Sequence, residues 1–246
     1  MFRVKSTRAA GRGLYATRDI APGTEICTEK PAYAVSAAGK AMEQEGLESL
    51  AAHIVASNAD RHRQAISQLV SNVDELKRQV PRKKAVEAAV MPVRALVGRM
   101  PVEHALSIVT SSSSTSANVD EDVRNTVRTS LLKLADAIDL DRVWLAYGRD
   151  WSNAMDVYSG TSSERRGSGL YPCYGAVMNH SNRPNCNLVF DEDWTLHVRS
   201  VVPIAAGEQL CHAYMDLGRP YSQLRAELRR KYGRHSHGRT RGQRDI

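Results

Sequence analysis

The stretch Met178-Asn179-His180-Ser181-Asn182-Arg183-Pro184-Asn185 is the most distinctive in this sequence of 246 residues. It places an amide and an imidazole, those of Asn179 and His180, beside Ser, Pro and Asn residues that favour turns. A lone Asn-His pair is usually a structural pair with satisfied hydrogen bonds, but these flanking residues favour a ligand site. Further along, Gly207-Glu208-Gln209-Leu210 leads to Tyr214, so a strand that ends near a tyrosine follows the ligand-binding turn.

Two glycine-containing segments come earlier, Gly11-Arg12-Gly13-Leu14 near the start and Gly169-Leu170-Tyr171-Pro172 just before the Asn-His stretch. Glycine lacks a Cβ, so the backbone at Gly11 and Gly13 can approach a ligand closely. Taken alone, the first segment is more typical of an ordinary glycine turn. The four segments together, in this order, are far more specific than any one of them.

These four segments resemble the SET-domain methyltransferases, and the Gly-Leu-Tyr-Pro segment resembles the SMYD branch, in which a long insertion splits the SET domain. The resemblance covers residues 3–35 and 150–232. It implies an α+β fold, a SET-type β-clip of short strands and hairpins interrupted by helices. We therefore expect four regions: 1–35 and 151–232 as the two parts of SET, 36–150 as the helical insertion, and 233–246 as a basic tail.

The resemblance also implies a function, that of a protein lysine N-methyltransferase that uses S-adenosyl-L-methionine and acts on a histone or non-histone protein. It implies a set of cofactor-binding residues, with Asn153 resting on a single matched position: Gly11, Arg12, Gly13, Asn153, Asn179 and His180. The alternative is a SET-derived scaffold, catalytically weak or inactive, that binds protein or RNA. A module that only binds nucleic acid would leave all four segments unexplained.

Tyr214 is the predicted catalytic residue. A phenol with a reference pKa near ~10 stays protonated at neutral pH, and it can donate one hydrogen bond while its oxygen accepts another. The resemblance implies that its hydroxyl faces the transferring methyl group; the alternative is a buried strand tyrosine. Tyr171 either lines the substrate lysine channel or simply packs, and Glu208 is expected to orient backbone in its turn.

We expect no metal site. The four cysteines, Cys27, Cys173, Cys186 and Cys211, form no Cys-x-x-Cys pair. Residues 40–150 lack the cysteines of a MYND finger, Asn182 stands where the SMYD branch has a zinc-binding cysteine, and the tail contains none. His235 and His237 fall far short of a site. Without the zinc-binding segment, either the helix expected around 224–232 closes the cofactor pocket, or the site is open and weak.

The formal net charge of +7 is concentrated at the two ends of the chain. The basic C-terminal tail would attract nucleic acid or an acidic protein, or it is a solvated terminus. No apolar run is long enough for a membrane span, so we expect a soluble intracellular protein, nuclear or cytoplasmic. The Arg-rich, acid-free residues 1–12 also match the composition of a mitochondrial presequence, which leaves a mitochondrial location as the alternative.

Local patterns predict several elements. Apolar residues three or four apart predict an amphipathic helix over 118–138, and Ser111 to Ser116 predicts a loop before it. Trp194, Leu196 and Val198 alternate with polar residues, which predicts a hairpin between 186–190 and the strand after the turn at 191–193. Segments 20–27 and 204–211 are similar, as expected of two like turns that each lead into a strand.

Overall fold

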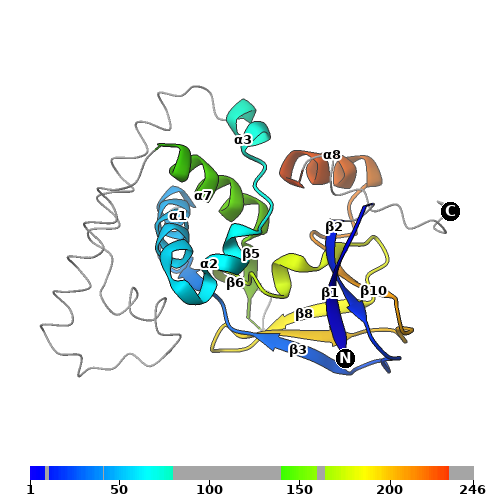
Figure 1. Ribbon diagram of the computed structural model, residues 1–246. Coiled ribbons are helices and arrows are strands. Elements are labelled where there is room, and N and C mark those ends of the chain that lie inside the picture. Colours follow the sequence, from blue (N-terminus) through cyan, green and yellow to red (C-terminus); the bar gives the residue numbers. More distant parts are fainter. Residues whose placement is uncertain (9–10, 41, 80–139, 160–163, 233–246) are drawn as a thin grey trace, which may run out of the picture. The chain divides into compact units, whose positions relative to one another are not determined.

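The computed structural model describes residues 1–8, 11–40, 42–79, 140–159 and 164–232. The predicted helix over 118–138, the loop at 111–116 and the tail at 233–246 lie outside these residues. Along the described part of the chain a run of short strands is followed by a run of helices, a second run of short strands and a last helix (Figure 1), so the predicted α+β class is confirmed. None of the described helices is both long and apolar enough to cross a membrane.

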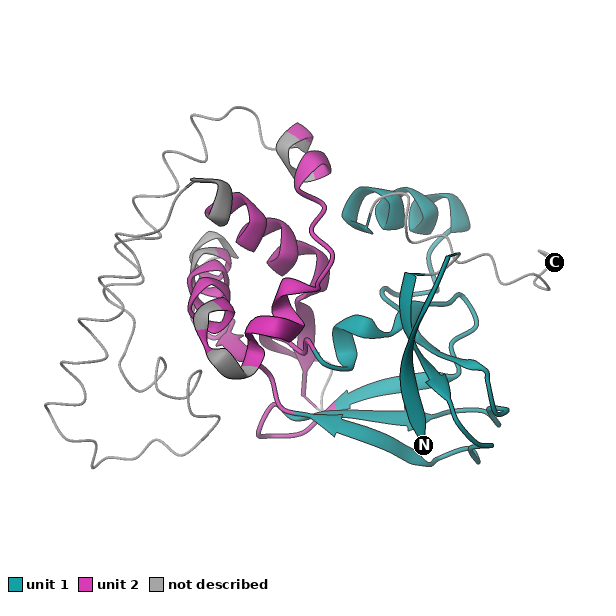
Figure 2. Ribbon diagram, in the orientation of Figure 1, with its two compact units in different colours: residues 1–29, 173–189, 195–246 teal, residues 30–172, 190–194 magenta. Residues whose placement is uncertain are grey.

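The chain divides into two compact units, coloured separately in Figure 2. Unit 1 comprises residues 1–29, 173–189 and 195–246, and unit 2 comprises residues 30–172 and 190–194. The predicted regional boundaries stay a prediction.

Unit 1 contains two sheets, and the first has the strand order β1-β2-β10-β7. Its strands are β1 (Phe2–Thr7), β2 (Gly11–Ala16), β7 (Asn179–His180) and β10 (Gln209–His212). The second sheet has the order β3-β9-β8, formed by β3 (Glu25–Glu29), β8 (Cys186–Phe190) and β9 (Leu196–Ser200). A short 3-10 helix η1 (Gly175–Val177) precedes β7, and helix α8 (Tyr221–Tyr232) follows β10.

The two similar segments of the sequence pair with each other. Ile20 and Ile204 form an isolated antiparallel bridge through two backbone hydrogen bonds of 2.9 and 3.0 Å. Each segment then turns at a glycine with positive φ, +78° at Gly23 and +83° at Gly207. Glycine reaches this region at little cost, so the two like turns are confirmed, and the second one leads into β10.

The predicted hairpin is also present, because β8 and β9 are neighbours in their sheet. Leu196 and Val198 are fully buried, while His197 on the other face lies 2.9 Å from Glu25. The placement of Trp194 on the strand was wrong. Trp194 ends the turn with φ +64°, and its N–H donates to Asp191, so turn closure overrides the two-residue alternation there.

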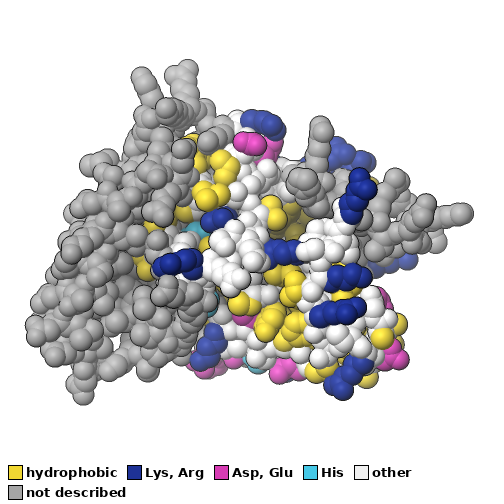
Figure 3. All heavy atoms as spheres, in the orientation of Figure 1, with side chains coloured by type: hydrophobic (Ala, Val, Ile, Leu, Met, Phe, Trp, Pro, Cys, Tyr) yellow, Lys and Arg dark blue, Asp and Glu magenta, His cyan; other side chains and the backbone are white. Residues whose placement is uncertain are grey.

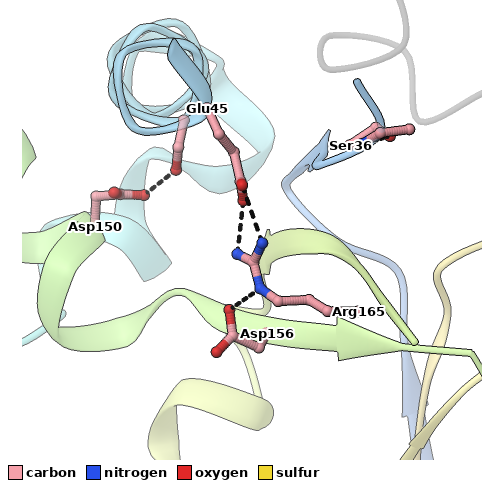
Figure 4. A network of polar contacts seen from close by, with 7 residues as sticks. Ser36, Glu45, Asp150, Asp156 and Arg165 are labelled. Carbon is pink, nitrogen blue, oxygen red and sulfur yellow. Dashed lines mark hydrogen bonds and ion pairs between the residues drawn. The ribbon is translucent and has the colours of Figure 1, made fainter. Parts of the chain in front are cut away.

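Unit 2 contains the sheet β4-β6-β5, formed by β4 (Tyr33–Ser36), β5 (Met155–Tyr158) and β6 (Arg165–Leu170), and helix α1 packs against β4 and β6. The helices are α1 (Met42–Asn58), α2 (Asp60–Ser67), α3 (Val73–Gln79) and α7 (Leu140–Asn153). Arg165 donates to both oxygens of Glu45, at 2.6 and 3.0 Å, and to Asp156 at 2.7 Å. Figure 4 draws these contacts as dashed lines. This paired fork ties the sheet to α1.

Candidate functional site

Strand β10 brings the separate sequence motifs of unit 1 together. It pairs antiparallel with β2 on one side, where Leu210 faces Leu14, and parallel with β7 on the other, where Cys211 faces Asn179. The glycine segment, the Asn-His pair and the strand before Tyr214 are therefore adjacent in one sheet. Parallel pairing requires a long connection, and the chain between β7 and β10 supplies it.

Asn185 holds this arrangement in place. Its amide donates to Glu208 Oε1 at 3.0 Å and to the carbonyl of Gln209 at 2.8 Å, and its Oδ1 accepts from the N–H of Cys211 at 2.8 Å. Glu208 also accepts from the N–H of Ala205 at 3.0 Å, so it orients backbone in its turn as the sequence predicted. Asn185 is buried, and these three side-chain hydrogen bonds lock the Asn-His stretch to β10.

Glu29, a residue that the sequence did not single out, anchors the approach to the Asn-His pair. Its carboxylate accepts from three consecutive backbone N–H groups, those of Cys173 at 2.7 Å, Tyr174 at 2.8 Å and Gly175 at 2.9 Å. Burial raises the pKa of the Glu29 carboxyl above its usual value, and the three N–H groups oppose that shift. The end of β3 is thereby fixed to the start of η1.

The glycine segment shows why both of its glycines are needed. Gly11 has φ +65° and open space around it, so its requirement is conformational. At Gly13 a Cβ would collide with Gln209 Nε2 and lie 3.0 Å from Asn179 Nδ2. Asn179 donates to the carbonyl of Arg12 at 2.8 Å, so two side-chain amides converge on the Gly13 backbone.

His180 connects the Asn-His pair to Tyr214. Its Nδ1 accepts from the N–H of Tyr214 at 3.1 Å, so the proton lies on Nε2, which donates to Asn182 Oδ1 at 2.9 Å. Burial lowers the pKa of His180, and the contact with Asn182 opposes this. The imidazole is therefore neutral at pH 7, and its tautomer is fixed.

Tyr214 lies among three other rings. Its centroid is 5.4 Å from His180, 4.9 Å from His212 and 4.6 Å from Tyr232. Its hydroxyl donates to the carbonyl of Met178 at 2.6 Å. Burial, followed by Tyr232 and Cys211, raises the pKa of this phenol far above its usual value, so it keeps its proton.

Tyr232 comes from the end of α8. Leu224 and Leu228, one turn apart, are the buried residues of this helix, and they hold it against the rest of unit 1. The sequence left two alternatives, that this helix closes the pocket or that the site is open and weak. The structure brings Tyr232 to Tyr214, and the closing role stays a prediction.

Asn153 and Tyr171 belong to unit 2 and have local partners there. The Asn153 amide donates to the carbonyls of Val70 and Arg149, each at 2.7 Å. Tyr171 is fully buried and donates to the carbonyl of Trp194 at 2.6 Å. The predicted roles of Asn153 in cofactor binding and of Tyr171 in the lysine channel stay predictions.

Two buried nitrogens near the motifs have no hydrogen-bond partner among the described residues. One is Gln209 Nε2, a donor beside Gly13, and the other is His212 Nε2, a nitrogen beside Tyr214. Neither residue was predicted to be functional. Buried polar groups are nearly always satisfied, so this pair of orphan atoms fits a region that receives a polar ligand such as the predicted cofactor.

Within the described residues, no group of three or more His, Cys, Asp or Glu side chains could hold a metal ion. The four cysteines are free thiols, and burial raises the pKa of Cys27 and Cys186 to about 12. Such thiols are poor thiolate ligands at neutral pH. The predicted absence of zinc stays a prediction.

Comparison with known proteins places these features in a family. The SET domain model matches residues 11–215. Histone-lysine N-methyltransferase SMYD3 of Mus musculus is 41% identical over 66 residues, and that of Homo sapiens 39% identical over 66. Each match covers 27% of this chain and 15% of the relative, so the chain spans a small part of those proteins.

Similar solved structures include the SET domain of LSMT bound to lysine and AdoHcy, with 18% identity and a TM-score of 0.41. Another is Rubisco LSMT bound to AdoMet, with 16% identity and a TM-score of 0.41. Each match covers 94% of this chain and 51% of the other. The family model spans every site residue from Gly11 to Tyr214, and the chain therefore belongs to the SET domain family.

Proposed function

We propose that this chain is an S-adenosyl-L-methionine-dependent protein lysine N-methyltransferase of the SMYD-like branch, without the MYND finger and the zinc-binding C-terminal segment. One observation carries the proposal. Strand β10 joins the glycine segment of β2 to the Asn-His pair of β7 and leads to Tyr214, whose hydroxyl and ring are both held by neighbours. The match to part of the SMYD3 enzymes supports the choice of branch.

The cofactor would be held by the residues that converge around Gly13. The open backbone at Gly11 allows close approach, and Asn179 and His180 offer backbone and side-chain groups at the adjacent strand. Gln209 adds a buried N–H donor that has no acceptor among the described residues. When bound, S-adenosyl-L-methionine supplies a sulfonium methyl group to the neutral lysine amine, whose lone pair forms the new N–C bond while the C–S electron pair stays on sulfur.

Tyr214 would act through its oxygen and not as a base. Its proton is donated to Met178, so the oxygen lone pairs remain free to accept weak C–H···O contacts from a methyl group in line for transfer. Its raised pKa keeps the phenol neutral throughout the working pH range. Tyr232, whose ring is tilted by 50° against that of Tyr214 at a centroid distance of 4.6 Å, would close the site.

A scaffold that binds RNA or an acidic protein is the second candidate. Figure 3 shows Lys and Arg side chains over α8 and the β1–β2 hairpin of unit 1. Arg225 and Arg229 are exposed on α8, whereas its acid, Glu227, is paired with Arg219 at 2.8 Å. This basic face supports binding of a negatively charged partner, whether or not the site is catalytic.

Binding of S-adenosylhomocysteine tests the proposal. Isothermal calorimetry should show one site per chain, and the melting temperature should rise with ligand concentration because only the folded state binds. Adenosine, which lacks the amino-acid arm, should bind more weakly. Absence of both heat and thermal shift at millimolar S-adenosylhomocysteine would favour the scaffold.

A further inference from the structure

Strand β1 is an open edge of the first sheet of unit 1. Among the described strands it pairs with β2 alone, in an unbroken antiparallel register from Phe2 to Thr7. Four of its six residues are exposed, and Val4, an apolar residue in the middle of the strand, is 51% exposed. Along its described length β1 has neither a proline nor a bulge, two devices that commonly protect a sheet edge. Its main chain is therefore accessible to another strand.

The register shows which backbone groups of β1 face outward. Ala16, the partner of Phe2 on β2, uses both its N–H and its C=O for hydrogen bonds of 2.9 Å to the turn before β10. The pair of Phe2 and Ala16 is thus a non-hydrogen-bonded pair. Such pairs alternate with hydrogen-bonded ones along an antiparallel ladder. The residues of β1 whose N–H and C=O groups point away from β2 are therefore Phe2, Val4 and Ser6.

The charges of β1 select the kind of strand that can add to this edge. Arg3 and Lys5 are exposed, share one face of the strand, and form no ion pair within the described part of the chain. Residues 1–18 contain no Asp or Glu. Antiparallel pairing of two copies of β1 about Val4 would set Arg3 opposite Lys5, and like charges directly opposite each other are destabilising. The edge therefore disfavours a second copy and favours an acidic strand.

We propose that β1 is a docking edge for an extended segment of a partner protein in which acidic and apolar residues alternate. The segment would add as a fifth strand to this four-stranded sheet, bonded through its main chain to the outward groups of β1. Its acidic side chains would lie beside Arg3 and Lys5, and an apolar one beside Val4. RNA fits less well, because its phosphates offer acceptors to the cations but no donors to the outward carbonyls. This inference is independent of whether the chain methylates lysine.

Hydrogen exchange followed by NMR on the full chain tests the docking geometry. The probe is the acetylated and amidated peptide Glu-Val-Glu-Val-Glu-Val-Glu. In the free protein the outward amides of Val4 and Ser6 should exchange rapidly, whereas the amide of Lys5, bonded to β2, should be protected. Saturating peptide should slow exchange at Val4 and Ser6 by about tenfold or more and leave Lys5 nearly unchanged.

Two modified peptides separate strand addition from charge. In the proposed register the valine N–H groups of the peptide point at β1, and the glutamate N–H groups point away from it. N-methylation of the valines should therefore weaken binding by about tenfold or more. N-methylation of the glutamates keeps the same charge and the same bonding edge, so this peptide should bind nearly as the unmodified one does.

Variants of β1 test the same contact from the protein side. Val4→Pro removes an outward N–H and no bond to β2, so it should weaken peptide binding by about fivefold with the melting temperature nearly unchanged. Arg3→Glu sets like charges side by side and should weaken binding by about tenfold. Arg225→Glu, exposed on α8, makes the same change in net charge and is the matched control. It should change the affinity by about twofold at most, because salt screens distant charges.

Each outcome decides the proposal. Equal losses for Arg3→Glu and Arg225→Glu, or equal affinities of the two N-methylated peptides, would reduce the contact to diffuse electrostatic attraction and overturn the docking edge. Absence of peptide binding at millimolar concentration would overturn it as well. If Val4→Pro unfolds the hairpin, Arg3→Glu and the modified peptides still decide, because they leave the backbone of β1 intact. Single-stranded RNA that protects the amides of Val4 and Ser6 while the peptide does not would assign the edge to nucleic acid instead.

Discussion

The hydroxyl of Tyr214 donates a 2.6 Å hydrogen bond to the main-chain carbonyl of Met178, the residue directly before the Asn-His pair. In return, His180 accepts the backbone N–H of Tyr214 at 3.1 Å. The two motifs are thus coupled through both the backbone and the side chain of Tyr214. Any change that displaces β7 should therefore also misdirect the phenol.

Gly13→Ala should destabilise the protein and weaken cofactor binding, because the new Cβ would collide with the Gln209 amide. Overpacking of this kind costs about 1–3 kcal/mol, measured by urea unfolding. Gln209→Ala in the same chain should recover part of that loss, since it removes the colliding group. Strict additivity of the two changes would contradict the packing that we describe.

Gly11→Ala is the contrast within the same motif. Its φ of +65° disfavours alanine, but no atom lies within 4 Å of the Cβ position. The cost should be about 1–2 kcal/mol. Because nothing collides, Gln209→Ala should give no rescue.

Glu29→Ala should strongly reduce stability, because three backbone N–H groups would lose their buried acceptor. We expect a loss of about 2–5 kcal/mol in urea unfolding, and a smaller one for Glu29→Gln, which keeps a carbonyl oxygen. Glu25→Ala, on the same strand but exposed, should change stability little. Equal effects of Glu29→Ala and Glu25→Ala would rule out the anchoring role.

Much of unit 1 could be predicted from local sequence. The two turns depend on Gly23 and Gly207, and the hairpin depends on the alternation at Leu196 and Val198. Both signals act between neighbouring residues, so both kinds of element could be predicted. Trp194 was misplaced because alternation alone does not show where a strand begins. The turn there closes through Trp194 itself, with its N–H donated to Asp191.

The position of β10 between β2 and β7 could not be predicted, because parallel pairing joins segments that share no local signal. The functional candidates beyond the motif were missed for a related reason. His212 does carry a signal, a polar residue at a position that alternates with buried Leu210 and should be apolar. Glu29 carries none, since the N–H groups that donate to it come from residues 173–175.

Stability should fall in mild acid because His53 is buried and neutral. Burial, with a smaller effect of Arg149, lowers the pKa of His53 to about 3, below its reference value near ~6.5. The unfolded state binds the proton first, so the contribution is complete above pH ~6.5 and is lost as the pH falls toward 3. One such histidine lowers the free energy of unfolding by about 2 kcal/mol between pH 7 and pH 5.

His53→Leu provides the check. Tyr33 donates its hydroxyl to Asp150, so that hydrogen bond survives the substitution. Chemical denaturation at pH 7, 6 and 5 gives the slope of the unfolding free energy against pH. This slope should be smaller in the variant, by an amount that corresponds to about one proton per chain. Parallel curves for the two proteins would mean that His53 titrates normally.

Purified protein should contain far less than one zinc per chain by elemental analysis. The described residues offer no cluster of ligands, and the thiols of Cys27 and Cys186 have pKa values raised to about 12. A chelator should leave the melting temperature unchanged, because no folding energy depends on metal. Stoichiometric zinc, or unfolding by the chelator, would contradict the zinc-free assignment.

Tyr214→Phe in a methyl-transfer assay tests the central claim most directly. The substitution keeps the ring against His212 and Tyr232 but removes the oxygen that donates to Met178. Stability should fall by about 0.5–1.5 kcal/mol, the value of one hydrogen bond, and S-adenosylhomocysteine should bind nearly as before.

With radiolabelled cofactor and a panel of histone and ribosomal proteins, the wild type should transfer methyl to lysine. The variant should be at least about tenfold slower, or about 1.4 kcal/mol in the barrier. Equal rates would contradict the role of Tyr214, and a wild type that neither binds cofactor nor methylates any protein would contradict the function.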